Sequence, residues 1–114
     1  TGAGTRGIGY VCVVRESDCQ AELYIDRGKE KSEENLKIFK MFQKNKDKIE
    51  KKFGDQLKWE ELPNRRACRI IKTSDVGGWA NEETWDKAHD VLIDYAIRIE
   101  KTFDEYIDLI RKIK

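Results

Sequence analysis

The stretch IGYVCVVRESDCQAELYI, residues 8–25, decides the fold class of this chain. Apolar side chains alternate with others at its beginning and again at its end, which is the period of a β-strand, and polar turn residues stand between the two runs. The stretch therefore predicts a β-hairpin. In its second arm, Ala21, Leu23 and Ile25 share one face, which we expect to be buried, and Tyr24 lies on the other face.

A helix is predicted next, with Ser32 as its N-cap and Gly54 as a left-handed C-cap. Acidic residues in its first turn suit the positive end of the helix dipole. Apolar residues recur at helical spacing and are expected to be buried: Leu36, Phe39, Phe42, Ile49 and Phe53. The polar stretch 43–48 interrupts this stripe, so we expect a bend or an exposed turn there.

Seven lysines lie between Lys37 and Lys52, which suggests nucleic-acid binding as one interpretation. Acidic residues are interspersed in and before this stretch: Glu33, Glu34, Asp47 and Glu50. The favoured interpretation is therefore a solvated helix face with ion pairs along the helix.

A second hairpin is predicted over residues 57–71, with a type I turn at Pro63. In its return arm, Arg69 falls on the face opposite Cys68, so that this arginine lies over the sheet rather than in the core. The following segment, 73–79, contains two adjacent glycines and is predicted to be a mobile linker.

The chain ends in a long predicted helix that begins after Asn81, a good N-cap. It would run for about 33 residues, or roughly 50 Å. Its apolar residues repeat as a heptad seam: Trp85, His89, Leu92, Ala96, Ile99, Phe103, Tyr106, Ile110 and Ile113. The first half is expected to cover the sheet. The second half, from Phe103, needs the helix at 32–54, another domain or another copy of the chain to cover it.

The order of these patterns predicts an α+β fold: a four-stranded antiparallel sheet in ββαββα order, with helices on one face and a long C-terminal helix. The 114 residues fit a single domain, 1–114, and the start at Thr1 suggests the C-terminal module of a longer chain. With 23 Lys and Arg against 22 Asp and Glu, the net charge of +1 gives no global attraction to nucleic acid or membrane. No apolar run is long enough to span a bilayer.

Cys12, Cys19 and Cys68 form an odd set without a C-x-x-C pair, which favours reduced thiols in a cytoplasmic protein; a Cys12–Cys68 bridge across adjacent strands is the alternative. His89 is expected to be a packed histidine rather than a catalytic base, because no nucleophile or carboxylate partner is identifiable. G-x-G-x-x-G at 2–7 lacks the preceding strand of a dinucleotide site and is interpreted as a flexible lead-in. We therefore expect no metal and no cofactor.

Two stretches and the terminal helix carry a family resemblance: AELYIDRG at 21–28 and FGDQLKWEELPNRRACRI at 53–70. Over nearly the whole chain, they resemble a prokaryotic family named only as domain of unknown function 4268. The resemblance implies a parent protein that carries an N-terminal domain of the restriction-endonuclease-like class, and it makes a nuclease one hypothesis for that parent. It implies no catalytic residue for this module, in which the acidic residue and the E-x-K or D-x-K strand of such a nuclease are not found.

Two classes of function follow from these observations. The first is a non-catalytic accessory domain that contacts DNA or RNA beside the nuclease-like domain, through side chains near the second hairpin: Tyr24, Lys58, Arg65, Arg66 and Arg69. The second is a protein-interaction or oligomerisation module, such as a homodimer, that acts through the long helix at Phe103, Tyr106, Ile110 and Ile113. Simpler explanations exist for both. The long helix can fold over its own sheet, and the arginines can pair across strands with Glu22, Asp26, Glu60 and Glu61.

Overall fold

The computed structural model describes residues 7–28, 30–61 and 67–111. Strands and helices follow one another in the predicted order: β1 (Ile8–Val14), β2 (Cys19–Ile25), α1 (Ser32–Lys44), α2 (Lys46–Phe53), β3 (Lys58–Glu61), β4 (Cys68–Ser74), a short 3-10 helix η1 (Glu82–Thr84) and α3 (Trp85–Arg111). The strand-period and helix-period stretches of the sequence therefore form the elements that they predict.

The four strands form one antiparallel sheet in the order β1-β2-β4-β3. Both predicted hairpins are present, and they join where β2 pairs with β4, so that Tyr24 lies beside Arg69. The α+β fold in ββαββα order is confirmed. The strand order itself was open, because alternation along a strand does not say which neighbour the strand takes.

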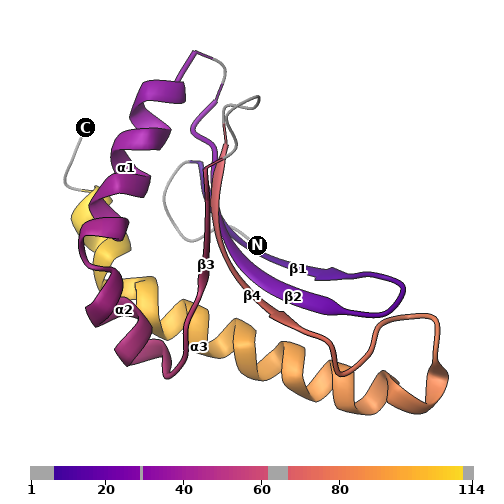
Figure 1. Ribbon diagram of the computed structural model, residues 1–114. Coiled ribbons are helices and arrows are strands. Elements are labelled where there is room, and N and C mark those ends of the chain that lie inside the picture. Colours follow the sequence, from indigo (N-terminus) through magenta and orange to yellow (C-terminus); the bar gives the residue numbers. More distant parts are fainter. Residues whose placement is uncertain (1–6, 29, 62–66, 112–114) are drawn as a thin grey trace.

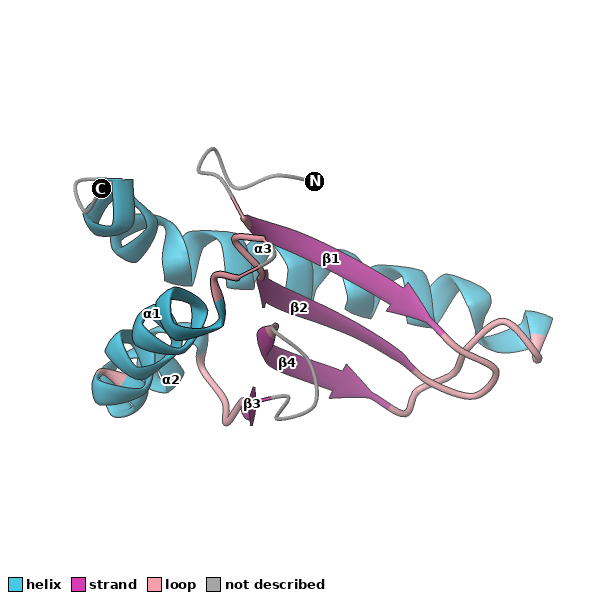
Figure 2. Ribbon diagram, turned by 90° about the horizontal axis from the view of Figure 1, so that it is seen from above, coloured by secondary structure: helices cyan, strands magenta, loops and turns pink. Residues whose placement is uncertain are grey.

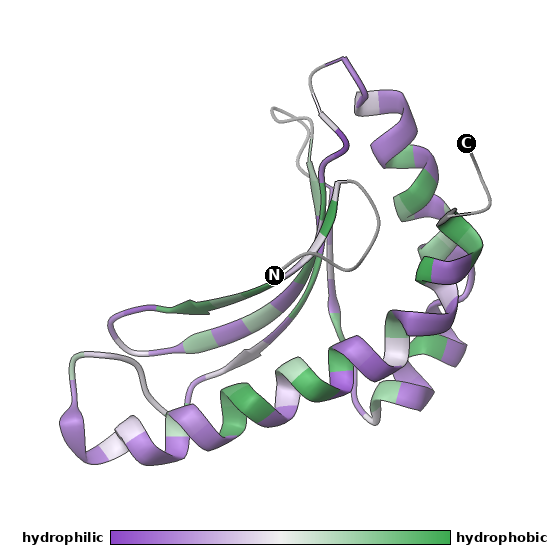
Figure 3. Cartoon of the chain, turned by 180° about the vertical axis from the view of Figure 1, so that it is seen from behind, coloured by the Kyte–Doolittle hydropathy of each residue, from purple (hydrophilic) through white to green (hydrophobic). Residues whose placement is uncertain are grey.

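All three α-helices lie on one side of the sheet, the convex side of its bend (Figure 1). Seen from above, β1, β2 and β4 lie in front of α3, and no helix of the described chain covers this concave side (Figure 2). The covered face of the sheet carries the predicted core residues, including Leu23 and Ile25 at 0% exposed and Ile70 at 0%. Along α3, apolar bands recur between polar ones, the pattern of an amphipathic helix (Figure 3).

The helix predicted over 32–54 is interrupted at Asn45, within the polar stretch where a bend is predicted. The Asn45 side-chain amide donates to the Met41 carbonyl oxygen (3.0 Å), and its backbone N–H donates to Phe42 (2.9 Å), which tightens the chain into a 3-10 turn. The predicted stripe is buried on both sides of this break, with Phe39 1% and Ile49 0% exposed.

The two predicted caps of this helical stretch have different outcomes. Gly54 ends α2 with φ 97°, the left-handed conformation in which glycine carries no Cβ penalty, as predicted. The prediction of Ser32 as N-cap is wrong, since Ser32 is the first residue of α1 and no side chain caps that end. The start of α1 is held instead by the preceding segment, where the Arg27 N–H donates to the Asn35 side chain (2.8 Å).

The long C-terminal helix begins at the predicted cap. The Asn81 side chain accepts a hydrogen bond from the Glu83 N–H (3.0 Å), η1 follows, and α3 then runs for 27 residues to Arg111. Its second half packs against α1 and α2, where the rings of Phe103 and Phe42 lie 5.3 Å apart. Of the three coverings considered for this half, the structure contains the first, the helical segment 32–54.

The heptad seam holds in the middle of α3 and is wrong at its start. Trp85 is 48% exposed and His89 is exposed, whereas Ala88, at 6%, occupies the core position. A straight α-helix drifts by about 20° per heptad, so one heptad seam cannot stay on one side of a helix of this length. The core side therefore passes through Ile99 and reaches Ala88 instead of His89, and the prediction of a packed histidine is wrong.

The segment 73–79, predicted to be a mobile linker, is fastened to the first hairpin. The Trp79 N–H donates to the Arg15 carbonyl oxygen (2.9 Å), and the N–H of the next residue, Ala80, donates to Glu16 (3.0 Å). Gly78 makes this approach possible, because a Cβ there would lie 1.9 Å from the Arg15 carbonyl oxygen. The linker prediction is therefore wrong where these backbone hydrogen bonds hold the loop.

The three cysteines are free. Cys12 on β1 and Cys68 on β4 are separated by β2, so the alternative of a disulfide across adjacent strands is wrong. Burial raises the pKa of the Cys19 and Cys68 thiols, whereas Cys12 is exposed.

Candidate functional site

The structure brings together the described members of the second-hairpin group. Tyr24 pairs with Arg69 across β2 and β4, and Arg69 pairs with Glu60 across β4 and β3, so all three lie on the concave face. Lys58 shares that face, because it is two residues from Glu60 on β3. The predicted arginines Arg65 and Arg66, and the turn at Pro63, lie outside the described residues.

Carboxylates neutralise the cations of this group. The Arg69 guanidinium lies 2.5 Å from a Glu60 oxygen and 3.5 Å from Glu22, and the Lys58 ammonium lies 3.0 Å from Glu60. Burial pushes the pKa of Glu60 upward, but the hydrogen bonds from Lys58 and Arg69 outweigh it and hold that pKa below its ordinary value. The simpler explanation, cross-strand ion pairing, is therefore what the structure shows for Arg69.

A second basic surface runs along α1 and α2. Five lysines share one side of these helices at spacings of three and four residues, and we call them the lysine face: Lys37, Lys40, Lys44, Lys48 and Lys51. All five are exposed and lie opposite the buried stripe of α1 and α2. The sequence analysis pointed to these lysines but favoured a solvated helix face on which ion pairs with nearby acids neutralise their charge.

Those ion pairs are mostly not formed. Lys40 lies 3.8 Å from Glu61, and within the described ranges no carboxylate oxygen approaches the other four ammonium groups to 4.0 Å. Two of the four acids of the stretch, Glu34 and Glu50, serve other partners. Glu50 accepts hydrogen bonds from the Leu57 N–H (2.8 Å) and the Trp59 indole (3.1 Å), and Glu34 pairs with Arg27 at 2.5 Å.

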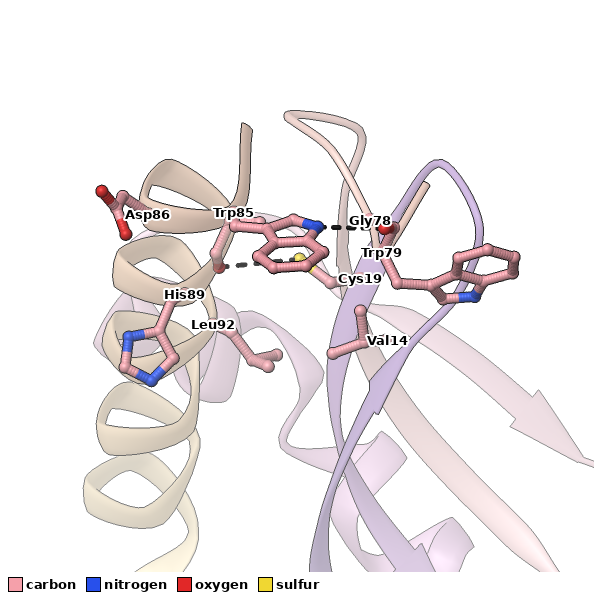
Figure 4. A pocket seen from close by; sticks show the side chains of 9 residues that line it. Val14, Cys19, Gly78, Trp79, Trp85, Asp86, His89 and Leu92 are labelled. Carbon is pink, nitrogen blue, oxygen red and sulfur yellow. Dashed lines mark hydrogen bonds between the residues drawn. The ribbon is translucent and has the colours of Figure 1, made fainter. Parts of the chain in front are cut away.

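A pocket of about 360 Å³ lies between the first turns of α3 and the end of the first hairpin. In Figure 4, the side chains of Val14, Trp85 and Leu92 surround one gap next to Cys19, whereas Asp86 and His89 point away from it on the outer side of α3. The Trp85 indole N–H donates to the Trp79 carbonyl oxygen (3.0 Å), which fixes the wall of the pocket. We call this site the tryptophan pocket.

Sequence reasoning missed the tryptophan pocket. It assigned Trp79 to a linker and Trp85 to a buried seam, yet the two side chains are 59% and 48% exposed. The available signal was the pair of tryptophans on either side of the helix cap Asn81, since large apolar side chains that gather at a surface mark binding sites.

The helix residues proposed for protein interaction are largely buried in the core of the domain itself. Phe103 is 0% and Ile110 1% exposed, and Tyr106 is half-buried with its ring 6.1 Å from that of Phe42. Ile113 lies outside the described residues. The exposed apolar residues of α3 are others, notably Ile93 and Ile97.

Among the described residues, no group of three His, Cys, Asp or Glu side chains could hold a metal ion, and no helix there is long and apolar enough to cross a membrane. The tryptophan pocket has apolar walls, and the one histidine at its rim is turned outward.

Comparison with known proteins places the chain in a family. The family described as domain of unknown function (DUF4268) matches residues 1–107. The chain is a DUF4268 domain. The match ends within α3, so it includes the sheet, α1, α2 and the tryptophan pocket. No curated protein and no solved structure matches the chain, so the DUF4268 description adds no activity to this geometry.

Proposed function

We propose that this DUF4268 domain is a non-catalytic accessory domain that contacts the phosphate backbone of a nucleic acid through its lysine face. The observation that supports the proposal is the lysine face, in which four of the five ammonium groups have no carboxylate oxygen within 4.0 Å among the described residues. The second-hairpin group is a weaker candidate, because Arg69 and Lys58 share the Glu60 carboxylate.

The spacing of the lysine face suits a polyanion. From Lys37 to Lys51 the helices advance by roughly 20 Å at 1.5 Å per residue, and duplex DNA carries a charge about every 1.7 Å along its axis. Lysine is a compact point charge without the planar fork that reads base edges, so the contact positions the nucleic acid without selecting a sequence.

In a parent protein of the kind that the family resemblance implies, the domain holds DNA or RNA next to a nuclease-like domain. Affinity then comes from counterion release at the lysine face, and the chemistry belongs to the neighbouring domain. Self-association through the second half of α3 is the weaker alternative, because Phe103 and Ile110 are already buried in the core.

Fluorescence anisotropy with labelled duplex DNA, single-stranded DNA and RNA over a range of salt tests the proposal. We expect a linear loss of log affinity with log salt. Replacement of Lys37, Lys44 and Lys48 by Gln should reduce the slope by about 3, since each phosphate contact contributes about 0.9 for duplex DNA.

Replacement of Lys87 and Lys101 by Gln is the control, because these lysines lie on α3 and not on α1 or α2. It removes two charges where the test variant removes three, and it should leave the salt slope unchanged. An Arg65→Gln, Arg66→Gln variant tests the second hairpin separately. Salt-independent or absent binding would end the nucleic-acid proposal, and loss of binding in the arginine variant alone would move the contact from the lysine face to the second hairpin.

A further inference from the structure

Exposed apolar side chains are concentrated at the tryptophan pocket. Val14, Trp79 and Trp85 line it and are 48%, 59% and 48% exposed. The volume of about 360 Å³ is at the lower end of the range for sites that bind small molecules. Large apolar side chains that gather at a surface mark a binding site, so this pocket has the size and the lining of a small-molecule site.

Three segments of the chain build the pocket, and direct contacts hold them together. The loop before α3 is fastened to the first hairpin by the Trp79 N–H, which donates to the Arg15 carbonyl oxygen (2.9 Å). The Trp85 indole N–H connects α3 to the same loop (3.0 Å), and the Cys19 thiol of β2 donates to the Ala88 carbonyl oxygen of α3 (3.9 Å). The walls are therefore in place before a ligand binds, which lowers the entropy cost of binding.

The indole rings of Trp79 and Trp85 are available to a cation. Elsewhere the chain places its own cations over aromatic rings: Arg98 lies 4.3 Å from the centre of the Phe53 ring, and Lys72 lies 5.9 Å from that of Tyr95. Within the described ranges, no lysine or arginine lies over either of the two tryptophans. Among aromatic side chains, tryptophan attracts cations most strongly, so the exposed indoles favour a positively charged ligand.

The segments that form the pocket are acidic. Residues 15–18 and 75–90 contain seven carboxylates against two lysine or arginine side chains, Arg15 and Lys87. Arg15 is already paired with Asp18 at 2.6 Å. The Asp86 side chain points away from the gap, so such acids act through their electric field rather than as direct ligands (Figure 4). The field attracts a cation and repels an anion over about 8 Å at physiological ionic strength.

The walls of the pocket restrict the kind of cation that fits. They are apolar, and among the described residues no group of three His, Cys, Asp or Glu side chains could hold a metal ion. A metal ion or a bare ammonium would lose its hydration shell there without oxygen ligands in return. An ammonium that carries methyl or larger apolar groups has less hydration to lose and packs against apolar walls and indole rings.

We propose that the tryptophan pocket binds a small organic cation, an ammonium with apolar substituents such as a quaternary ammonium. Its charged head lies against the Trp85 indole, which borders the gap in Figure 4, and its substituents contact Val14 and Leu92. The indole and the acidic segments select for positive charge, and the apolar walls select against hydrated ions. This site is separate from the lysine face and does not rest on the function proposed for that face.

Choline and its uncharged counterpart of the same shape, 3,3-dimethylbutan-1-ol, are the probes, with benzyltrimethylammonium as a larger cation. NMR of the indole N–H groups follows the titration. We expect the Trp85 signal to shift, whereas Trp59, whose indole donates to Glu50 (3.1 Å) away from the pocket, is the internal reference. Choline should bind at least about tenfold more tightly than the alcohol. Equal affinities, or no shift with either cation, overturn the proposal.

Trp85→Leu isolates the contribution of the aromatic ring. It keeps an apolar wall, so the choline affinity should fall at least about tenfold while the affinity for the alcohol changes much less. Retained binding of the alcohol shows that the pocket is still formed. Leu109→Ala, which alters another exposed apolar residue of α3, is the control and should bind both probes like the wild type. A Trp85→Leu variant with unchanged choline affinity overturns the proposal.

A charge variant decides the case in which Trp85→Leu loses both probes. Asp86→Asn with Asp90→Asn should weaken choline about two- to threefold at low salt, leave the alcohol unaffected and leave the far-ultraviolet circular dichroism unchanged. Glu100→Gln with Asp104→Asn is the matched control, since it removes two acids at the same spacing roughly 21 Å further along α3. An equal effect of both pairs, or no effect of either, overturns the proposal.

Discussion

Glu60 holds together the ion pairs on the concave face of the sheet. Its carboxylate forms ion pairs with both Arg69 and Lys58, and the Arg69 guanidinium also lies 3.5 Å from Glu22, which is 4% exposed. Alternation along β2 and β4 predicts that Glu22 and Arg69 share a face, but it does not predict that β3 supplies the second carboxylate. An arginine between two acids leaves little uncompensated charge for a ligand on the uncovered side of the sheet.

We predict that Glu60 contributes to stability at neutral pH and that this contribution disappears in acid. The pKa of Glu60 is lowered in the folded protein, so its stabilisation is complete above the ordinary glutamate pKa and is lost as pH falls through the lowered value. Glu60→Gln should cost about 1–2 kcal/mol at pH 7. Urea unfolding of both proteins at pH 7 and near pH 3 should show this difference shrinking. A difference that is constant with pH would contradict the ion-pair explanation.

Arg98 connects two helices at the element scale. Its guanidinium donates to the Phe53 carbonyl oxygen from two nitrogens (3.0 and 2.7 Å), lies over the Phe53 ring and pairs with Asp94 at 3.0 Å. The last carbonyl groups of a helix have no partner within the helix, and Arg98 satisfies one of them at the end of α2. One side chain of α3 therefore satisfies a carbonyl group at the end of α2, which Gly54 terminates.

We predict that Arg98→Ala destabilises the domain by about 2 kcal/mol, because a buried carbonyl group loses a charged donor and Phe53 loses a packed neighbour. Arg98→Lys should recover little of this, since an ammonium cannot both donate twice and stack. Chemical denaturation measures these differences, with Asp94→Ala as the control for the exposed ion pair. If Arg98→Lys were as stable as the wild type, the planar geometry would not matter.

At the scale of the whole molecule, residues from every α-helix and from at least three strands share one core. Phe42 of α1, Ile49 of α2 and Ile107 of α3 belong to the same buried cluster as Leu23 and Ile70. Because these elements share one buried cluster, we expect them to unfold together. The prediction of a single domain over 1–114 can therefore be tested by following the unfolding of the chain.

We predict one cooperative unfolding transition. Tryptophan fluorescence, which includes the exposed Trp79 and Trp85, and far-ultraviolet circular dichroism, which follows mainly α3, should give the same midpoint and the same free energy. Phe42→Ala should lower the midpoints of both signals together and reduce the free energy of unfolding by about 3–5 kcal/mol. Ile97→Ala, at an exposed site, should change that free energy little. Separate midpoints would divide the chain into more than one cooperative unit.

The sequence by itself determined the elements of this protein. The periods of residues 8–25 and 57–71, the cap at Asn81 and the break near Asn45 are written in short stretches, because strand alternation, capping and helix propensity act between near neighbours in the chain. The net charge of +1 is a property of the whole chain. It does not indicate that lysines gather on one side of α1 and α2, or that acids outnumber cations elsewhere.

Only the tertiary structure decided where those charges and apolar residues stand relative to one another. The pairing of β2 with β4 made partners of Arg69 and Glu22, and the turning of Glu50 toward Trp59 removed one carboxylate from the reach of the lysine face. The drift of α3 relative to a heptad placed Trp85 outside the core. Each of these outcomes depends on contacts between residues far apart in the chain, about which local periodicity carries no information.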